Sequence, residues 1–200
     1  MVQHLLTAFV TITVALFITE LTDKDALLIL TLATKSRALV VFLAGSTAFI
    51  ITTTLFVTLG TLASTFLPIL WIKLAGGAIM ISYGLWEARG LLGLGMVTRE
   101  EQKLESRRVG WRVFLGMVGT LALLDIAGDA TEILTIVLVA QYSDALLVFT
   151  ATCTGLIAAT AMETALGNRL GRLLTPHRLR YVSIVVFLSL GVGIIISTLV

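Results

Sequence analysis

Apolar residues run through this chain in long stretches that short polar segments interrupt. A membrane-spanning helix needs about 20 mostly apolar residues. Six segments reach that length, namely 4–34, 38–61, 68–89, 111–141, 145–167 and 177–200. We therefore predict an all-α integral membrane protein with six transmembrane helices and no soluble domain. The first and fourth segments are longer than a straight crossing requires and carry acidic clusters, so we expect them to be tilted, kinked or locally unwound at the charges.

The composition agrees with this pattern. Hydrophobic residues make up 58% of the 200 residues and charged residues 13%, about half the charged share of a globular protein. The single cysteine, Cys153, excludes an internal disulfide framework and a cysteine-based zinc site. The N-terminus lacks the basic region of a cleavable signal peptide. We expect the lipid bilayer as surroundings, no nucleic-acid partner and no prosthetic group, and a homo-oligomer stays open.

Basic residues gather in the connections on one side of the predicted membrane. Twelve of the fourteen lie there: Lys35, Arg37, Arg89, Arg99, Lys103, Arg107, Arg108, Arg112, Arg169, Arg172, Arg178 and Arg180. The opposite side has Lys73 alone. Because basic connections stay in the cytoplasm, the charged linker 93–110 is predicted to be cytoplasmic and both termini to lie outside.

The two halves of the chain resemble each other at a spacing of 107 residues. Residues 33–42 and 140–149 share alanine, serine, Ala-Leu and Val-Phe at matching positions. We predict a first three-helix repeat over 1–92, the linker 93–110, and a second repeat over 111–200. Three is an odd number, so the second repeat enters the membrane upside down relative to the first. Inverted repeats of this kind place a substrate site near the midplane, between the halves.

Each half has one acidic cluster in its first segment. Glu20 and Asp23 are three residues apart and share a helix face, as do Asp125, Asp129 and Glu132 at spacings of four and three. Charge at membrane depth is costly and is usually functional. If both faces turn inward, they bring together hard oxygen ligands, which suit Ca²⁺, Mg²⁺ or Mn²⁺ better than copper or zinc.

Neighbouring residues are candidates for supporting roles. Thr22, Thr131 and backbone carbonyls at a helix break would complete a ligand shell, and Gly128 would let the backbone distort. Lys24 is expected as a counter-ion to a neighbouring aspartate, with a snorkelling side chain as the alternative. Asp25 either pairs with Lys24 or touches the substrate.

An empty site of this kind cannot keep every carboxylate charged. Burial and like-charge repulsion both favour the neutral form, so some groups would hold protons that a divalent cation displaces. Glu20, Asp23, Asp125 and Asp129 are the expected proton-coupling residues, and they would titrate as a set. This reasoning predicts cation/proton exchange.

Other polar residues have plainer interpretations. Glu163 lies near the cytoplasmic end of the fifth segment, where we expect it to be solvated or paired with Arg169, and Asp144 is expected to be solvated. The threonine stripes either line a path or bond their own helix backbone or a neighbouring helix. These stripes comprise Thr47, Thr54, Thr58, Thr150 and Thr154.

The motifs resemble those of a known family. The cation/proton antiporters of the lysine-exporter superfamily, which include the Golgi manganese/calcium and chloroplast manganese transporters, carry Glu-x-Gly-Asp-Lys/Arg-Ser/Thr twice. Here 20–25 is similar at Glu20, Asp23 and Lys24, with threonine for the glycine and aspartate for Ser/Thr. The second copy matches at Gly128, Asp129 and Thr131. Two further stretches look like parts of the family's chain. The family's first loop resembles residues 32–45, and its third helix resembles residues 71–77 through 83–84.

The second copy departs from the family pattern. Ile126 stands where the family has glutamate, and the nearest acid is Asp125, one residue early. Ala130 replaces the basic residue, and Glu132 stands where the family often has glutamine. The departures put the ligand geometry and the choice of metal in doubt.

The resemblance implies six helices in inverted repeats and export of Mn²⁺ or Ca²⁺ in exchange for protons. The metal and protons would bind Glu20, Asp23, Asp125 and Asp129, with Glu132 next in line. The short N-terminus favours a prokaryotic plasma membrane. Other cargoes are Fe²⁺, Cd²⁺ or a cationic amino acid, and a passive channel is a further alternative. The enzyme alternative is an intramembrane aspartyl protease, of whose Gly-x-Gly-Asp motif only half is present; we expect no enzyme.

Overall fold

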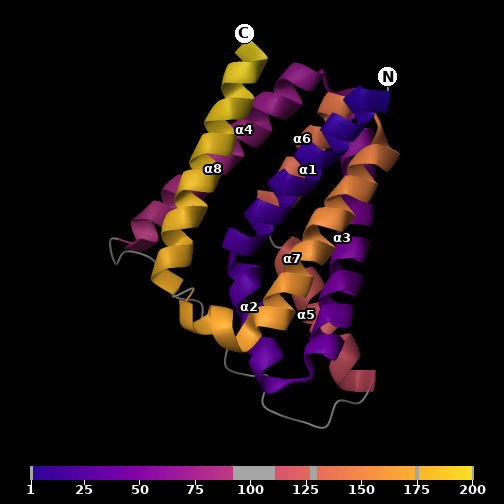
Figure 1. The fold of residues 1–200 in the computed structure, drawn as a ribbon. Helices are drawn as coiled ribbons and strands as arrows, with labels where there is room; N and C mark the ends of the chain where they lie inside the picture. The colour runs from indigo at the N-terminus through magenta and orange to yellow at the C-terminus, as the bar shows by residue number, and fades with distance from the viewer. Residues whose placement is uncertain (1, 92–110, 127–129, 174–175, 200) are drawn as a thin grey trace.

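The computed structural model describes residues 2–91, 111–126, 130–173 and 176–199, and these residues form helices joined by short turns (Figure 1). The predicted linker 93–110 therefore lies outside the described residues. No strand occurs within them. The helices are α1 (Val2–Thr22), α2 (Lys24–Lys35), α3 (Ala38–Phe66), α4 (Ile69–Leu91), α5 (Trp111–Ile126), α6 (Ala130–Tyr142), α7 (Ala145–Leu173) and α8 (Pro176–Leu199).

The first acidic segment is broken where its charges lie. It divides into α1 and α2 at Asp23, whereas the fourth segment is described as α5 up to Ile126 and as α6 from Ala130, with 127–129 outside the described residues. A polar cluster and freed backbone groups are tolerated at membrane depth only where the protein itself surrounds them. The predicted interruption of the first segment is confirmed, and that of the fourth segment stays a prediction.

The other predicted segments each form one helix, some longer than expected. α3 continues five residues past 61 and ends where Leu67 adopts an extended backbone (φ −118°, ψ 136°). Leu67 precedes Pro68, and a residue before proline is pushed out of the helical region. α7 continues to Leu173, beyond the predicted 167. α8 opens at Pro176, the first helical position that suits proline.

Helix bounds and contacts recur between the halves. α3 and α7 each have 29 residues and begin at 38 and 145, a spacing of 107. α7 packs on α1 and α2, and α3 packs on α5 and α6. Gly60 of α3 meets α6 at Ile136, while Gly167 of α7 meets α2 at Ala33. Gly60 and Gly167, which are 107 residues apart, thus lie at corresponding helix crossings of the two halves.

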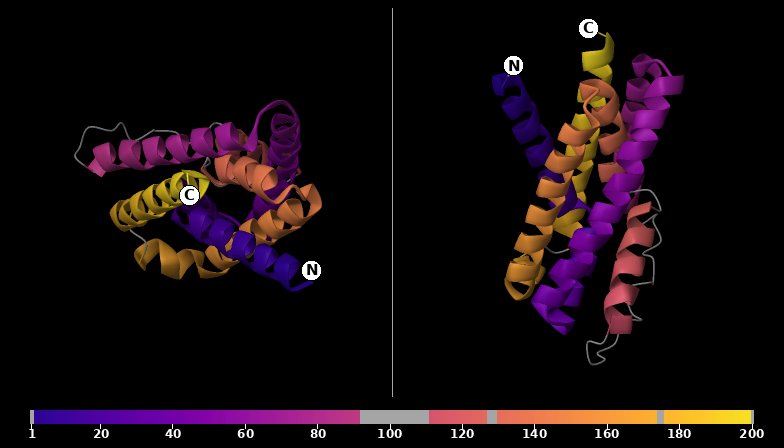
Figure 2. Two further views of the ribbon diagram at one scale, coloured as in Figure 1. Left: turned by 90° about the horizontal axis from the view of Figure 1, so that it is seen from above. Right: turned by 90° about the vertical axis from the view of Figure 1, so that its right-hand side faces the viewer.

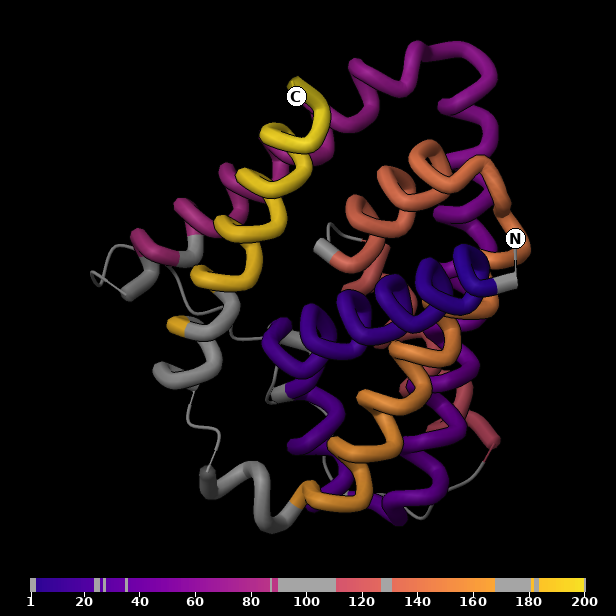
Figure 3. The backbone as a smooth tube through the Cα atoms, turned by 45° about the horizontal axis from the view of Figure 1, so that its top comes forward, coloured from indigo at the N-terminus to yellow at the C-terminus, as the bar shows by residue number. Residues whose placement is uncertain are grey.

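The pairs of matching helices run antiparallel. Gly45 of α3 faces Thr160 of α7, and Thr53, further along α3, lies beside Cys153, earlier along α7. α4 and α8 likewise pack in opposite directions, since Gly84 meets Leu188 and Gly77 meets Ile195. This pair lies to one side of the other helices (Figures 2 and 3).

Four helices in the described residues have the length and apolar composition to cross a membrane. They cover Gln3–Thr22, Ala38–Phe66, Ile69–Trp86 and Ala145–Gly167, with shorter apolar stretches at Thr131–Tyr142 and Ile184–Leu199. The chain is thus an all-helical membrane protein, while six crossings and the inverted repeat stay predictions. The marked N- and C-termini lie at the same end of the molecule (Figure 1).

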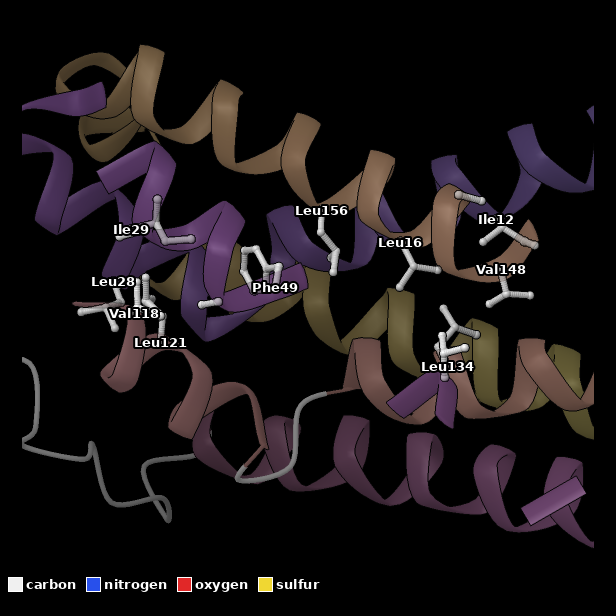
Figure 4. Packing of buried hydrophobic residues seen from close by; sticks show 14 of the residues in the cluster. Ile12, Leu16, Leu28, Ile29, Phe49, Val118, Leu121, Leu134, Val148 and Leu156 are labelled. Atoms are coloured by element: carbon white, nitrogen blue, oxygen red, sulfur yellow. The ribbon is translucent and has the colours of Figure 1, made fainter. Parts of the chain in front are cut away.

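Large apolar side chains cover the outside of the molecule, and many polar ones lie inside. Leu6, Leu39, Leu123 and Leu146 are each more than 60% exposed, whereas Glu20 and Thr160 are fully buried. Lipid tails accept such an apolar surface, and buried polar groups mark functional sites in membrane proteins. Buried apolar residues pack between the polar ones, with Phe49 of α3 and Leu156 of α7 central in this packing (Figure 4).

Close approach of α1 and α7 depends on Gly155. A Cβ atom built on Gly155 would lie 2.6 Å from the carbonyl oxygen of Thr13 and 3.2 Å from the amide nitrogen of Phe17. Both are backbone atoms, so relief requires the helices to separate. Close packing through small residues is the usual way in which helices associate in membranes.

We expect Gly155→Ala to lower the free energy of unfolding by roughly 1–3 kcal/mol, because the added methyl group overpacks this crossing. The measurement is thermal unfolding of the detergent-solubilised protein. Gly116→Ala is the matched control, since a Cβ at Gly116 meets nothing within 4 Å and alanine is the better helix former. Equal loss of stability in both variants would contradict the packing argument.

Candidate functional site: two helix breaks with buried carboxylates

The first break is a tight turn between α1 and α2. The backbone N–H of Asp23 donates to the carbonyl oxygen of Glu20 at 3.0 Å. The hydroxyl of Thr22 donates to the carbonyl of Thr19 at 2.9 Å, and the hydroxyl of Thr19 donates to Ala15 at 2.8 Å. Short-range bonds therefore satisfy several carbonyls at the end of α1, which have no partner within a regular helix.

The second acidic cluster includes residues 127–129, which lie outside the described residues. The predicted site residues Gly128 and Asp129 belong to this stretch, so their geometry is not described. Asp125 lies in the last turn of α5, and Glu132 lies in the first turn of α6. An acidic side chain in the first turn of a helix is stabilised by the positive end of the helix dipole.

The two broken helices cross each other. α1 packs against α6, and α2 packs against α5. Because α1 contacts α6 and α2 contacts α5, the break at Asp23 lies near the crossing of the two acidic segments. α7 flanks α1 and α2, and α3 flanks α5 and α6. The long helices thus flank both acidic segments.

The described acidic residues of both clusters are buried. The exposed fractions are 0% for Glu20, 2% for Asp23, 1% for Asp125 and 5% for Glu132. These side chains come from α1, the bend, α5 and α6, so each half of the chain contributes two. Among described residues, no three His, Cys, Asp or Glu side chains are close enough together to hold a metal ion. The full ligand set therefore stays a prediction that includes Asp129.

Burial explains the departure at Asp125 and Ile126. Asp125 is 1% exposed, whereas Ile126 is 44% exposed. On α5 the position of the shifted acid therefore faces the protein interior, and the next position faces outward. The isoleucine at the position of the family's glutamate is on the lipid-facing side, where an apolar side chain is suitable.

Thr52 of α3 is a site residue that the sequence analysis missed. Its hydroxyl lies 3.2 Å from the carbonyl of Ala48 and 3.3 Å from that of Phe49, and it also donates to Oδ2 of Asp125. Hydrogen bonds to an ionised group are stronger than those between neutral groups. Thr52 thereby ties α3 to the end of α5 beside the second break.

The predicted threonine stripes have a different role. Thr47, Thr54 and Thr58 donate to carbonyls four residues earlier in α3, and Thr150 and Thr154 do the same in α7. For these residues the alternative that such threonines bond their own helix is confirmed. No signal in the sequence separates Thr52 from the stripes, because only the packing shows which face of α3 is covered.

Supporting residues are only partly described. Thr131 is 1% exposed at the start of α6, and its carbonyl accepts a hydrogen bond from the hydroxyl of Thr135 at 2.8 Å. Thr22 is buried at the first break. Lys24 and Asp25 lie in the first turn of α2, but their side chains are outside the description. The ligand role of these residues stays a prediction.

Glu163 is not where we expected it. The sequence predicts a solvated or Arg169-paired side chain, but Glu163 is fully buried on α7. The prediction of solvation is wrong because it considered only the distance from the segment end, and Glu163 lies on the face of α7 that the other helices cover. Arg169 is a residue whose side chain the structure does not describe. Asp144, by contrast, is exposed and accepts the N–H of Leu147 at 3.0 Å.

Thr52→Val should lower the free energy of unfolding by roughly 1–3 kcal/mol, because Asp125 loses a donor within the protein interior. Thermal unfolding in detergent measures the difference. Thr54→Val, on the exposed side of the same helix, removes a hydroxyl that bonds only to the carbonyl of Ile50 among described contacts and should change stability much less. Equal effects of the two variants would argue against a special bond to Asp125.

Comparison with known proteins agrees with this arrangement. The family model for the divalent cation/proton antiporter GDT1 matches the chain over residues 8–92 and 113–199, one segment in each half. Neither a curated protein nor a solved structure matches the chain. The two matched segments each contain one acidic cluster with buried carboxylates. The chain thus belongs to the GDT1 family of divalent cation/proton antiporters, and it is a membrane transporter and not an enzyme.

Proposed function

We propose that this protein exports Mn²⁺ in exchange for protons, through a site at the crossing of the two helix breaks. The observation that carries the proposal is the burial of acidic residues from both halves, Glu20 and Asp23 from one and Asp125 and Glu132 from the other. With Asp129, they supply only oxygen ligands. Mn²⁺ and Ca²⁺ accept such ligands readily, while softer metals favour sulfur and imidazole.

The exchange follows from electrostatics. Several carboxylates buried together cannot all be ionised without a cation, since burial and mutual repulsion both favour neutral forms. Glu20, Asp23, Asp125 and Asp129 would therefore hold either protons or the cation. Cation binding releases protons, and protonation releases the cation. The groups form one coupled set, so the protons belong to the site and not to single residues.

The backbone of the breaks supports cation binding. Interrupted membrane helices commonly offer carbonyl groups at the end of one half-helix to cations. Here α1 ends at Thr22 and α5 ends at Ile126, so each break has one such C-terminal end. Thr22 and Thr131 are buried beside them and would supplement the carboxylates.

Alternating access would come from motion of one half against the other. The recurrence of helix bounds at a spacing of 107 residues and the antiparallel packing of α3 with α7 support inverted repeats. In such transporters the substrate site stays near the midplane while the halves rock around it. We propose residues 1–92 and 111–200 as these halves.

The central test is cation-driven proton flux in proteoliposomes that contain the purified protein and a pH-sensitive dye. A Mn²⁺ gradient should drive protons in the opposite direction in the wild type. Asp23→Asn and Asp129→Asn should each reduce this flux at least about tenfold, a loss equal to about 1.4 kcal/mol of binding or barrier energy, because each removes a charge from the shared site.

Asp144→Asn is the control, because it makes the same chemical change at an exposed helix cap and should leave the flux unchanged. Competition by Ca²⁺, Fe²⁺, Cd²⁺ and lysine in the same assay ranks the cargoes. Cation flux without any coupled proton movement would favour a channel, and flux that survives in both site variants would remove those residues from the site.

We further propose that both termini lie outside a prokaryotic plasma membrane, with residues 93–110 in the cytoplasm. In a Cys153→Ser background, a membrane-impermeant maleimide should label Gln3→Cys in intact cells, and should label Thr98→Cys only after the cells are opened. The physical reason is the retention of basic connections in the cytoplasm. The reverse labelling pattern would invert the orientation.

A further inference from the structure

The buried carboxyl group of Glu163 has no role in the site described so far. Glu163 is 0% exposed, and among the described residues neither of its carboxylate oxygens has a hydrogen-bond partner. A buried carboxylate without a donor is strongly disfavoured in its ionised form, whereas a neutral carboxyl group avoids most of that cost. Such a residue is rare inside a membrane protein, and it usually serves the transport path.

Helix contacts place Glu163 beside the first break. Gly155 of α7 meets α1 at Thr13 and Phe17, and Gly167 of α7 meets α2 at Ala33. α7 therefore runs alongside α1 and then α2, in the same direction, and passes the bend at Asp23 between these contacts. Glu163 lies within this stretch, eight residues after Gly155 and four before Gly167.

The face of α7 that holds Glu163 is turned toward the other helices. Thr160, one turn earlier, contacts the backbone position of Gly45 on α3, and Thr164 is 7% exposed. The hydroxyls of Thr160 and Thr164 donate to the carbonyls of Leu156 and Thr160. These hydroxyls bond to carbonyls of their own helix and donate no hydrogen bond to Glu163.

A second buried polar group without a partner lies at the same crossing. Ser46 follows Gly45 on α3, is 8% exposed, and its hydroxyl has no hydrogen-bond partner. Two buried polar side chains near the contact of α3 and α7 thus make no hydrogen bond within the described residues. In another state of the protein, a water molecule could supply these hydrogen bonds.

The surrounding charges come from several elements, and α3 contributes none because its sequence lacks ionisable residues. Besides Glu163, the ionisable residues of the helices packed on α7 and of α7 itself are His4 and Glu20 on α1, Asp23 at the bend, Lys24, Asp25 and Lys35 on α2, Glu132 and Tyr142 on α6, and Cys153, Arg169 and Arg172 on α7.

We propose that Glu163 is a proton carrier of the transport cycle, separate from the carboxylates at the two breaks. It holds a proton in the state that the structure shows, releases that proton to the cytoplasmic side when the halves move, and is protonated again from the outer side as the cation leaves. One proton is bound and one is released, and no bond other than O–H changes. This role rests on the proposed cation/proton exchange.

The position fits a carrier on the cytoplasmic side of the breaks. From the level of Asp23, the chain of α7 leads through Glu163 toward Gly167 and the end of the molecule opposite the two termini (Figure 1). The proposed orientation makes this end cytoplasmic.

Glu163→Gln tests the proposal, because glutamine copies the neutral shape but cannot release a proton. In proteoliposomes, the wild-type exchange rate should change up to about tenfold per pH unit where one carrier group titrates, and Glu163→Gln should lose this slope while still moving the cation. Glu163→Asp should retain the slope. Asp144→Asn is the matched carboxyl-to-amide control and should behave as the wild type.

Two further measurements keep the outcome decisive. Thermal unfolding of Glu163→Gln should match the wild type, because a neutral carboxyl group and an amide impose similar costs when buried. Infrared spectra of the purified protein should show a protonated carboxyl band that Glu163→Gln lacks and Asp144→Asn keeps. If Glu163→Gln does not fold, the infrared spectrum of Glu163→Asp tests the proposal instead. The protonated carboxyl band should then shift and not disappear.

An unchanged pH slope in a folded Glu163→Gln variant would overturn the carrier role, and so would the absence of any difference in the infrared band. A wild-type protein that moves no protons against a cation gradient would overturn the proposed exchange instead. In that case the infrared comparison still shows whether Glu163 holds a proton, so the two failures are distinguishable.

Discussion

Buried charge is the constraint on which the rest of this structure depends. A carboxyl group inside a bilayer must be neutral, be paired with a cation or lie among groups of the protein that stabilise it. Here Glu20 and Asp23 lie at the break between α1 and α2, while Asp125 lies in the last turn of α5 and Glu132 in the first turn of α6. The breaks are tolerated because α3 and α7 shield them from lipid. The apolar outer surface, the long flanking helices and the close glycine contacts all follow from this requirement.

The family's reaction has a simple physical basis in this arrangement. A site with several buried acids is stable when it holds protons or a divalent cation, and it is unstable when it holds neither. Exchange is therefore the consequence of an unfavourable empty state. A buried acid does not require the family's exact motif. Asp125 lies one position before the family's glutamate and still faces the interior.

Much of the helical architecture follows from the sequence, and its limits have physical causes. Runs of apolar residues gave the helix bounds to within a few residues, and the charges at Asp23 marked one break because polar groups cannot remain in a continuous lipid-facing helix. Thr52 and Glu163 were not predicted in their roles. Their importance depends on which face of a uniformly apolar helix is covered, and a helix that is apolar all round has no periodicity that identifies its covered face. That information comes only from packing, as between Gly45 and Thr160.

The equal length of α3 and α7 has a mechanical consequence. Each has 29 residues, about 43 Å at the usual rise per residue, which exceeds a hydrocarbon core of about 30 Å. They contact each other near their middles, where Phe49 and Leu156 lie (Figure 4). Two stiff rods that touch near their centres act as levers with arms of about 20 Å. A small tilt of one rod over the contact would separate the ends on one face of the membrane while it draws them together on the other.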